Sequence, residues 1–322
     1  MQAALNIIGD DLKLVEQQFR KDLESDVPLI RKVGEYVLSS GGKRVRPALL
    51  LLAARLCDYQ GDKAVPLASV VEFIHTATLL HDDVVDSATL RRGIASANTL
   101  WGNEASVLVG DFLFSKSFSL MVCAGSLDIL RVLSNATTII AEGEVMQLLC
   151  TGEMDLTEAD YIGVVQAKTA ILMSAACEAG AILGQVSLEK QKMLADFGMD
   201  LGIAFQLMDD TLDYVATEEE FGKSIGHDLE EGKITLPLIH TLLHCNEEER
   251  EAIAVVVEKD EMSLEDFRNV SGLVKRYGGI EYTVKIARGY IETCASHLSG
   301  FGPNPVREAL LDLADYVVTR SK

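Results

Sequence analysis

The sequence predicts an all-α protein, and three observations support this prediction. Apolar residues recur with helical periodicity through almost the whole chain of 322 residues. Proline is rare, with 6 residues in the chain against a usual share of ~5%, whereas the helix-favouring residues Ala, Leu and Glu are common. No alternating apolar pattern with a hairpin turn is found, so no strand is expected.

The expected helices follow one another with short connections, and we expect them to form a single domain over residues 1–322. At about 150 residues per domain, the length alone would suggest two domains. However, no linker rich in proline or serine and no repeat of fixed period divides the chain. The predicted helices cover residues 5–23, 28–39, 46–58, 63–85, 104–123, 126–150, 157–184, 188–215, 236–244, 247–258, 263–276, 278–297 and 304–320.

Two longer breaks, at residues 86–103 and 216–235, interrupt the predicted helices. Each contains glycine and charged residues, and each directly follows a cluster of aspartates. Loops in such positions often carry function. The region 245–322, by contrast, predicts helix packing and no chemistry, so we look for the functional residues beside the two breaks.

The charge of the chain limits its partners. The formal net charge is −20, which argues against duplex DNA or an anionic membrane surface as the main partner, because both favour basic proteins. A small anionic substrate stays possible, since local basic groups can bind it within an acidic protein. We therefore expect a small-molecule substrate and no nucleic acid.

No feature of the sequence predicts secretion or a membrane span. The six cysteines show neither CxxC nor zinc spacing, which favours buried reduced thiols and a cytoplasmic protein. The N-terminus lacks a basic region and carries Asp10 and Asp11, so no signal peptide is expected. The longest apolar runs, 48–54 and 179–183, are far shorter than the ~18 residues of a transmembrane helix.

The first aspartate cluster, HDDVVD (81–86), ends the fourth predicted helix. Asp82 and Asp86 lie one helical turn apart on one face, with Asp83 beside them. His75 falls near the same direction two turns earlier, because a helix turns by about 100° per residue. His75 is therefore a candidate ligand, and a hydrogen-bonded histidine of the core is the alternative.

The second cluster lies in FQLMDDTLD (205–213). Gln206, Asp209, Asp210 and Asp213 are spaced at i, i+3, i+4 and i+7, which forms one polar stripe along a helix. The remaining positions of the segment are mostly apolar. The stripe is therefore the polar side of an otherwise buried helix.

Two solvated acidic faces are the alternative interpretation of these clusters, and two observations count against it. Each cluster places like charges at i and i+4, which destabilises a helix, and no Lys or Arg on either stripe balances them. A hard cation would balance them, and Mg²⁺ prefers one or two carboxylates together with water and substrate phosphates. The spacing therefore predicts Mg²⁺ holding a diphosphate between two facing aspartate stripes.

Basic residues accompany both clusters in the sequence. The segment GGKRVRP (41–47) combines glycines, which allow close approach of the backbone, with cations that bind phosphate oxygens. It lacks the spacing of a Walker A motif. Taken singly each cation is a weak signal, and a surface lysine is the alternative for the one inside predicted helix 157–184. The other cations are Arg91, Arg92, Lys168, Lys223 and Lys233.

In this order the motifs resemble those of the trans-isoprenyl (polyprenyl) diphosphate synthase family, of the long-chain bacterial type that is similar to octaprenyl diphosphate synthases. Several independent motifs in one order are far more specific than DDxxD alone, and no motif position departs from the family pattern. The motifs are GGKRVRP (41–47), DDVVD (82–86), RRG (91–93), KT (168–169), FQLMDDTLD (205–213) and two GK pairs (222–223 and 232–233).

The resemblance implies the isoprenoid synthase fold, a single helical bundle around a deep apolar cavity, in a homodimer. It also implies head-to-tail prenyl transfer between an allylic diphosphate and isopentenyl diphosphate, with Mg²⁺ as the cofactor. The implied metal ligands are Asp82, Asp86 and Asp209, supported by Asp83, Asp210 and Asp213. The implied allylic diphosphate ligands are Arg91, Lys168, Thr169, Gln206, Lys223 and Lys233. The implied isopentenyl diphosphate ligands are Lys43, Arg46, His75 and Arg92.

The resemblance also bears on the length of the product. Short-chain relatives tend to carry a bulky aromatic residue five positions before the first aspartate motif, where this chain has Ala77, followed by Thr78. Small residues there leave the cavity open, so its floor would lie deeper, with Phe118 and Met121 as candidates and ordinary core residues as the alternative. We expect a C40 product, within C35 to C50, as the precursor of a respiratory quinone side chain.

Three other functions are compatible with parts of the sequence. A class I terpene cyclase uses the same metal-triggered ionisation, but it needs no second diphosphate site such as GGKRVRP and Arg91-Arg92 suggest. A carboxylate-bridged di-iron bundle needs two ExxH motifs, and only Glu72 to His75 forms one. A catalytically silent subunit of a heteromeric synthase would have lost motif aspartates, which are intact here.

Overall fold

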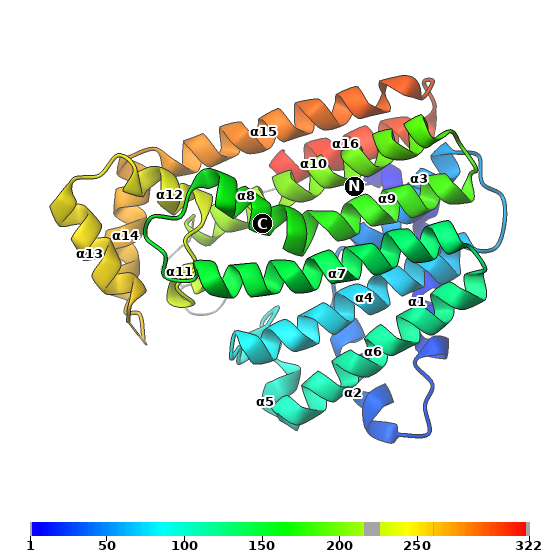
Figure 1. The fold of residues 1–322 in the computed structure, drawn as a ribbon, viewed down its shortest axis with the longest axis horizontal. Helices are drawn as coiled ribbons and strands as arrows, with labels where there is room; N and C mark the ends of the chain where they lie inside the picture. Colours follow the sequence, from blue (N-terminus) through cyan, green and yellow to red (C-terminus); the bar gives the residue numbers. More distant parts are fainter. Residues whose placement is uncertain (1, 216–225, 260, 320–322) are drawn as a thin grey trace. The chain divides into compact units, whose positions relative to one another are not determined.

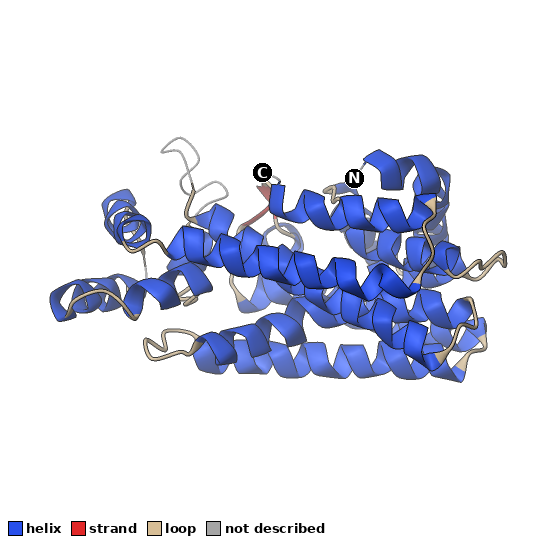
Figure 2. Cartoon of the chain, turned by 90° about the horizontal axis from the view of Figure 1, so that it is seen from above, coloured by secondary structure: helices blue, strands red, loops and turns tan. Residues whose placement is uncertain are grey.

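A computed structural model of the chain describes residues 2–215, 226–259 and 261–319, and these residues are mostly helical. The prediction of an all-α protein is confirmed. The helices fall into two compact units, which are described one after the other. Figure 1 gives the labels of the helices, and Figure 2 shows how little of the described chain is strand.

Unit 1 comprises Met1–Thr138, Leu172–Gly198 and His297–Leu313. Its centre is α4, which packs against α1, α3 and α6; α4 and α6 run side by side in Figure 1. Because α4 is covered on several sides, its apolar residues are buried nearly all round. The complete helices of unit 1 are α1 (Gln2–Asp22), α2 (Pro28–Ser39), α3 (Val45–Leu56), α4 (Ala64–Val85), α5 (Ala97–Trp101) and α6 (Asn103–Ala124), with the short 3₁₀ turn η2 (Leu298–Gly300).

Unit 2 comprises Ile139–Ile171, Met199–Ser296 and Ala314–Lys322. In this unit α12 packs against α8 and α14. The complete helices of unit 2 are α8 (Glu158–Val165), α11 (His227–Glu230), α12 (Leu236–Leu242), α13 (Glu247–Val257) and α14 (Leu264–Arg276). The helices that contribute residues to both units are α7 (Leu127–Cys150), α9 (Ile171–Leu183), α10 (Leu188–Asp213), α15 (Gly279–His297) and α16 (Pro305–Thr319).

Local sequence signals explain where several helices begin. The Thr157 hydroxyl accepts a hydrogen bond from the backbone of Asp160 and caps α8. Asn246 and Ser263 each form a capping box, with Glu249 and Asp266 as the partners at the third helical position. Such caps satisfy backbone N–H groups that the first turn of a helix leaves without a partner.

Two details of the backbone differ from the predictions, and both carry candidate site residues. The break expected at 86–103 contains a hairpin of two short strands, β1 (Leu90–Arg91) and β2 (Ile94–Ala95). Arg92 and Gly93 both have positive φ, as the two central residues of a tight hairpin turn require. The prediction of no strand was wrong here, because Arg-Gly is not a usual signal for this turn.

The helix predicted at 157–184 is helical from Glu158 to Leu183, but it is not of one helical type throughout. After α8 the chain forms a π-helical turn at Gln166–Ala170, labelled η1, before α9 begins. Lys168 and Thr169 lie in this turn. A π turn inside an α-helical stretch often accompanies a functional site, because it changes the direction in which the side chains point.

Among the residues that the structure describes, three helical stretches are long and apolar enough to cross a membrane, judged by length and composition alone. They are α4, α6 and Glu158–Leu183. The prediction of no membrane-spanning segment rested on uninterrupted apolar runs alone. By mean hydropathy, this prediction does not hold. In α4 and Glu158–Leu183, 61% of the apolar window is buried inside the protein, which accounts for its composition, whereas only 28% is buried in α6.

The cysteines are free thiols, and most of them are at least partly buried. Cys57, Cys177 and Cys294 are buried, and burial raises the pKa of the Cys57 thiol to about 11. A thiol with a raised pKa is a poor nucleophile. Cys123, on α6, differs from the prediction of buried thiols because it is exposed.

Candidate active site

The first aspartate cluster ends α4, and its three aspartates have different surroundings. Asp83 is buried, and its Oδ1 accepts a hydrogen bond of 2.6 Å from Arg91 Nε. Burial raises the pKa of the Asp83 carboxyl, and the charge of Arg91 opposes that shift. Asp82 and Asp86 are half-buried and lie one turn apart, with the backbone N–H of Asp86 donating to the carbonyl of Asp82. Of the three, Asp83 is the one turned into the protein.

The hairpin after α4 returns Arg91 to the helix that carries Asp83. Arg91 is expected to bind the allylic diphosphate, and in the structure its guanidinium forms an ion pair with Asp83. Arg92, at the hairpin turn, donates through Nη1 to the carbonyl of Gly41. The hairpin therefore connects the first aspartate cluster with the glycine-rich segment of the same unit.

Two arginines of the glycine-rich segment 41–47 contact side chains of α4. Arg46 Nη1 lies 3.1 Å from His75 Nε2, and a neutral His75 can accept this hydrogen bond. The pKa of His75 is held well below its usual value, first by burial and then by the charges of surrounding arginines. A Cβ at Gly42 would lie only 3.0 Å from Arg92 Nη1, so glycine leaves room for that side chain.

Sequence reasoning missed one arginine of this basic group, Arg44, and its acidic partner, Glu72. Arg44, with positive φ, donates through Nη1 to Glu72 Oε1 at 2.5 Å and through Nη2 to the carbonyl of Leu38 at 2.7 Å. Glu72 is buried and lies one turn before His75 on α4. The sequence offered Glu72 only as part of an ExxH motif, so its pairing with Arg44 could not be anticipated.

The second aspartate cluster lies at the end of α10, in unit 2, and is built into a hydrogen-bond chain. Asp210 is buried, and it accepts hydrogen bonds from the Tyr161 hydroxyl and from Gln206 Nε2. Gln206 in turn accepts from the Thr169 hydroxyl at 2.9 Å. Burial raises the pKa of Asp210 to about 8, and Asp228 adds to this shift.

The other two aspartates of the second cluster differ in their partners. Asp213 accepts backbone hydrogen bonds from Gly226 at 2.7 Å and from Asp228 at 3.1 Å. These bonds lower its pKa, but burial is the larger effect and raises it to about 6. Asp209 is half-buried on the same stripe. Asp213, the last residue of α10, therefore binds the backbone at the start of α11.

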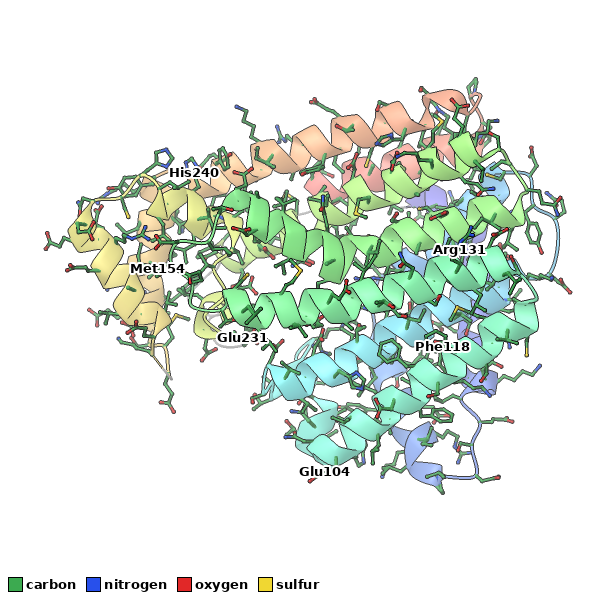
Figure 3. The ribbon with its side chains drawn as sticks, in the orientation of Figure 1. Glu104, Phe118, Arg131, Met154, Glu231 and His240 are labelled. Carbon is green, nitrogen blue, oxygen red and sulfur yellow. The ribbon has the colours of Figure 1, made fainter. Side chains whose placement is uncertain are left out.

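Two lysines expected at the site lie in unit 2, each beside a glutamate. Lys168 Nζ is 2.7 Å from Glu144 Oε2, and Lys233 Nζ is 2.5 Å from Glu231 Oε2; Figure 3 labels Glu231. A Cβ at Gly143 would lie 2.9 Å from the Lys168 backbone nitrogen, so glycine lets α7 pass close to the π turn. The third lysine expected to bind the allylic diphosphate, Lys223, lies outside the described residues.

A pocket of about 130 Å³ in unit 2 collects these groups. Its polar lining includes both lysines and the hydrogen-bond chain, and its apolar lining includes Leu156 and Val165. A pocket with apolar walls and a few convergent polar groups is the usual form of a small-molecule site. The polar residues named above that line it are Tyr161, Lys168, Thr169, Gln206, Asp210, Asp228 and Lys233.

The donor set fits a hard divalent cation. Within residues 2–215, 226–259 and 261–319, no three or more Asp, Glu, His or Cys side chains are arranged so that the protein alone could coordinate a metal ion. The carboxylates instead crowd one another, since each of Asp210, Asp213 and Asp228 contributes to raising the pKa of another. A small number of protein carboxylates is enough for Mg²⁺, because this ion also takes water and substrate phosphates as ligands.

The residues expected to set product length are placed differently from one another. Ala77 is fully buried in the core of unit 1 with Phe73, Val109 and Leu113. Met121 is 1% exposed, and Thr78 is half-buried, with its hydroxyl donating to the carbonyl of His75. Phe118 is 37% exposed on α6 (Figure 3). Met121 is thus a core residue, whereas Phe118 lies at the surface of the chain.

Known proteins similar to this chain share its length and fold. The polyprenyl synthetase family model matches residues 27–274. The chain is 43% identical to octaprenyl diphosphate synthase of Escherichia coli, over 98% of both chains. It is 38% identical to an all-trans-nonaprenyl-diphosphate synthase of Rhodobacter capsulatus, over 99% of this chain and 98% of that one.

Solved structures agree with this assignment. A polyprenyl synthase of Caulobacter crescentus, complexed with calcium and isoprenyl diphosphate, has a TM-score of 0.95 and 42% identity, and the match covers 100% of this chain and 98% of that one. A decaprenyl diphosphate synthase of Rhodobacter capsulatus has a TM-score of 0.94 and 43% identity, covering 99% and 98%. The helical fold is therefore the isoprenoid synthase fold, and the chain belongs to the polyprenyl synthetase family as a trans-polyprenyl diphosphate synthase, a prenyltransferase.

Proposed function

We propose that this enzyme adds isopentenyl diphosphate units head-to-tail to an allylic diphosphate such as farnesyl diphosphate, and that it requires Mg²⁺. The family uses these two classes of substrate. The observation that carries the proposal is that each of the two units has its own group of cations. Arginines surround His75 in unit 1, and lysines line the pocket of unit 2. A reaction between two diphosphates needs two anion-binding groups, whereas a cyclase needs one.

The aspartates divide into two roles in this proposal. Asp82, Asp86 and Asp209 are the proposed Mg²⁺ ligands. Asp83, Asp210 and Asp213 support them, because each already accepts hydrogen bonds from the protein. Mg²⁺ would neutralise the diphosphate leaving group as its C–O bond breaks.

The diphosphate ligands follow the same division. The proposed allylic diphosphate ligands are Arg91, Lys168, Thr169, Gln206, Lys223 and Lys233, with Arg91 oriented by Asp83. The proposed isopentenyl diphosphate ligands are Lys43, Arg46, His75 and Arg92. Neutral His75 orients Arg46 by accepting its hydrogen bond.

The chemistry needs no nucleophilic side chain. The double bond of isopentenyl diphosphate attacks the allylic carbon, and the departing diphosphate takes the proton that is lost from the new chain. Water would destroy the allylic cation, so the reacting carbons need an apolar, closed environment. The apolar walls of the pocket, such as Leu156 and Val165, serve this purpose.

We propose a C40 product, within a range of C35 to C50, as the precursor of a quinone side chain. Ala77 supports a long product because a small side chain at this buried position leaves space for a growing tail. Met121 remains a candidate for the floor of the tail cavity, and Phe118 could contribute only where another chain covers it.

We also propose that the enzyme is a cytoplasmic homodimer. The support for the homodimer is α6, because only 28% of its most apolar stretch is buried in the single chain. Val107, Leu108, Phe118 and Val122 are exposed along this helix. Exposed apolar side chains on one side of a helix, which here also carries the exposed Asp111, favour an interface, and a second copy of the chain is its proposed partner.

One incubation tests the reaction. Purified protein is supplied with labelled isopentenyl diphosphate and farnesyl diphosphate, with Mg²⁺ or with a chelator, and the dephosphorylated products are sized by chromatography. The expected product is near C40 and appears only with Mg²⁺. Chains that stop at C15 or C20 would overturn the proposed length. Absence of condensation with farnesyl, geranyl and dimethylallyl diphosphates would point to a silent subunit or a cyclase.

A further inference from the structure

Each described lysine of the pocket in unit 2 is already paired with a carboxylate. The Lys168–Glu144 pair is 20% and 27% exposed, and the Lys233–Glu231 pair is 18% and 26% exposed. Both pairs are therefore partly withdrawn from water, where charge interactions are less screened. A diphosphate that binds these lysines meets a glutamate beside each of them.

The lining of the pocket adds further acid. Asp210 and Asp228 line it together with the two lysines. Each of these lysines also has a glutamate partner, Glu144 or Glu231, whose negative charge offsets the charge of the lysine. A free diphosphate, which carries several negative charges, is repelled by such surroundings, whereas a diphosphate neutralised by divalent cations is not.

We propose that Glu144 and Glu231 are specificity determinants: by pairing Lys168 and Lys233, they make the pocket select metal-bound diphosphate and reject metal-free diphosphate. This inference rests on the proposed function, because it takes the lysines as diphosphate ligands. Its physical basis is electrostatic. Removing a negative charge beside a lysine strengthens the binding of an anion, and the gain in affinity grows with the negative charge of that anion. Metal-free diphosphate carries more negative charge than its metal complex and should therefore gain more. Discrimination therefore depends on the repulsive glutamate as well as on the attractive lysine.

The test compares Glu144→Gln with the unchanged protein. The affinity for inorganic diphosphate is measured by isothermal titration, once with a chelator and once with excess Mg²⁺. We expect the variant to bind metal-free diphosphate about tenfold more tightly and metal-bound diphosphate less than about threefold more tightly, so that the preference for the metal complex falls. Glu231→Gln gives the same measurement at the second lysine, should Glu144→Gln fail to fold.

The matched control is Glu142→Gln. Glu142 is on the same helix two residues away, its side chain is exposed, and the substitution removes the same charge. Its two affinities should equal those of the unchanged protein. An equal gain in both conditions, or no gain without metal, would overturn the role of the glutamates. If the unchanged protein binds no diphosphate even with Mg²⁺, the proposed function fails as well.

Discussion

Arg44 Nη1 and Glu72 Oε1 lie 2.5 Å apart, and the side chains are only 15% and 5% exposed. The pair joins the glycine-rich segment to α4, and Arg44 also donates to the carbonyl of Leu38. Glu72 and His75 are neighbours on α4, and His75 is bonded to Arg46. The Arg44–Glu72 pair therefore fixes the segment that carries the proposed isopentenyl diphosphate ligands Lys43 and Arg46.

Glu72→Gln should weaken both stability and substrate binding. Removing one partner leaves a poorly solvated charge on Arg44, which costs about 3 kcal/mol of unfolding free energy. Denaturant unfolding measures this loss. The KM for isopentenyl diphosphate should rise while the KM for the allylic substrate stays the same, since only the segment of unit 1 is loosened.

Glu16→Gln is the control for this prediction. Glu16 is the second acidic partner of Arg44, at 3.4 Å, but it is 47% exposed. Exposed ion pairs contribute little, so the change should stay below about 0.5 kcal/mol. A similar loss in both variants would show that burial of Glu72 is not what makes the pair important.

The aspartates of the first cluster should separate into two kinds by mutation. Asp82→Ala should lower turnover by about 100-fold or more while the circular dichroism spectrum and melting temperature stay unchanged, because it removes a proposed metal ligand. Asp209→Ala should behave in the same way. Asp83→Ala should also lower the melting temperature, because Arg91 then loses its buried partner at 2.6 Å. Near-normal rates for Asp82→Ala or Asp209→Ala would contradict the metal assignment.

Most of the fold could be predicted from the sequence because helical periodicity is local. The helix expected at 104–123 is observed at Asn103–Ala124, and the one expected at 28–39 has those bounds. The stripe of α10 was also visible, since spacing along one helix determines which residues share a face. The polar chain from Asp210 through Gln206 to Thr169 uses that face.

The features of the site that could not be predicted depend on contacts between residues that are distant in the sequence. Periodicity gives the face of Lys168 but not Glu144, 24 residues earlier, as its partner. The π turn at Gln166–Ala170 lies against Gly143, a packing relationship with no local signal. Arg92 adopts positive φ without being glycine or asparagine, and its side chain reaches the carbonyl of Gly41. The sequence therefore predicted where helices form, but not which segments contact one another.

Ala77→Tyr should shorten the product. Ala77 is fully buried among Phe73, Val109 and Leu113, so a tyrosine must either fill a tail cavity or overpack the core at a cost of about 1–3 kcal/mol. Chromatography of the dephosphorylated products measures the length, and thermal unfolding measures the cost. Ala295→Tyr, at an exposed position of α15, is the control. A stable Ala77→Tyr enzyme with unchanged product length would show that this position does not line the cavity.

Leu108→Glu should dissociate the proposed homodimer. Leu108 is 66% exposed on α6, the least buried of the three long apolar stretches, and a charge there cannot be desolvated in an apolar interface without a partner. Sedimentation velocity at micromolar concentration should show dimers for the unchanged chain and monomers for the variant. Leu188→Glu is the matched control, because Leu188 is 81% exposed at the start of α10 and belongs to no proposed interface. If both variants stay dimeric, the exposed face of α6 is not what joins the two copies, and another surface of the chain must do so.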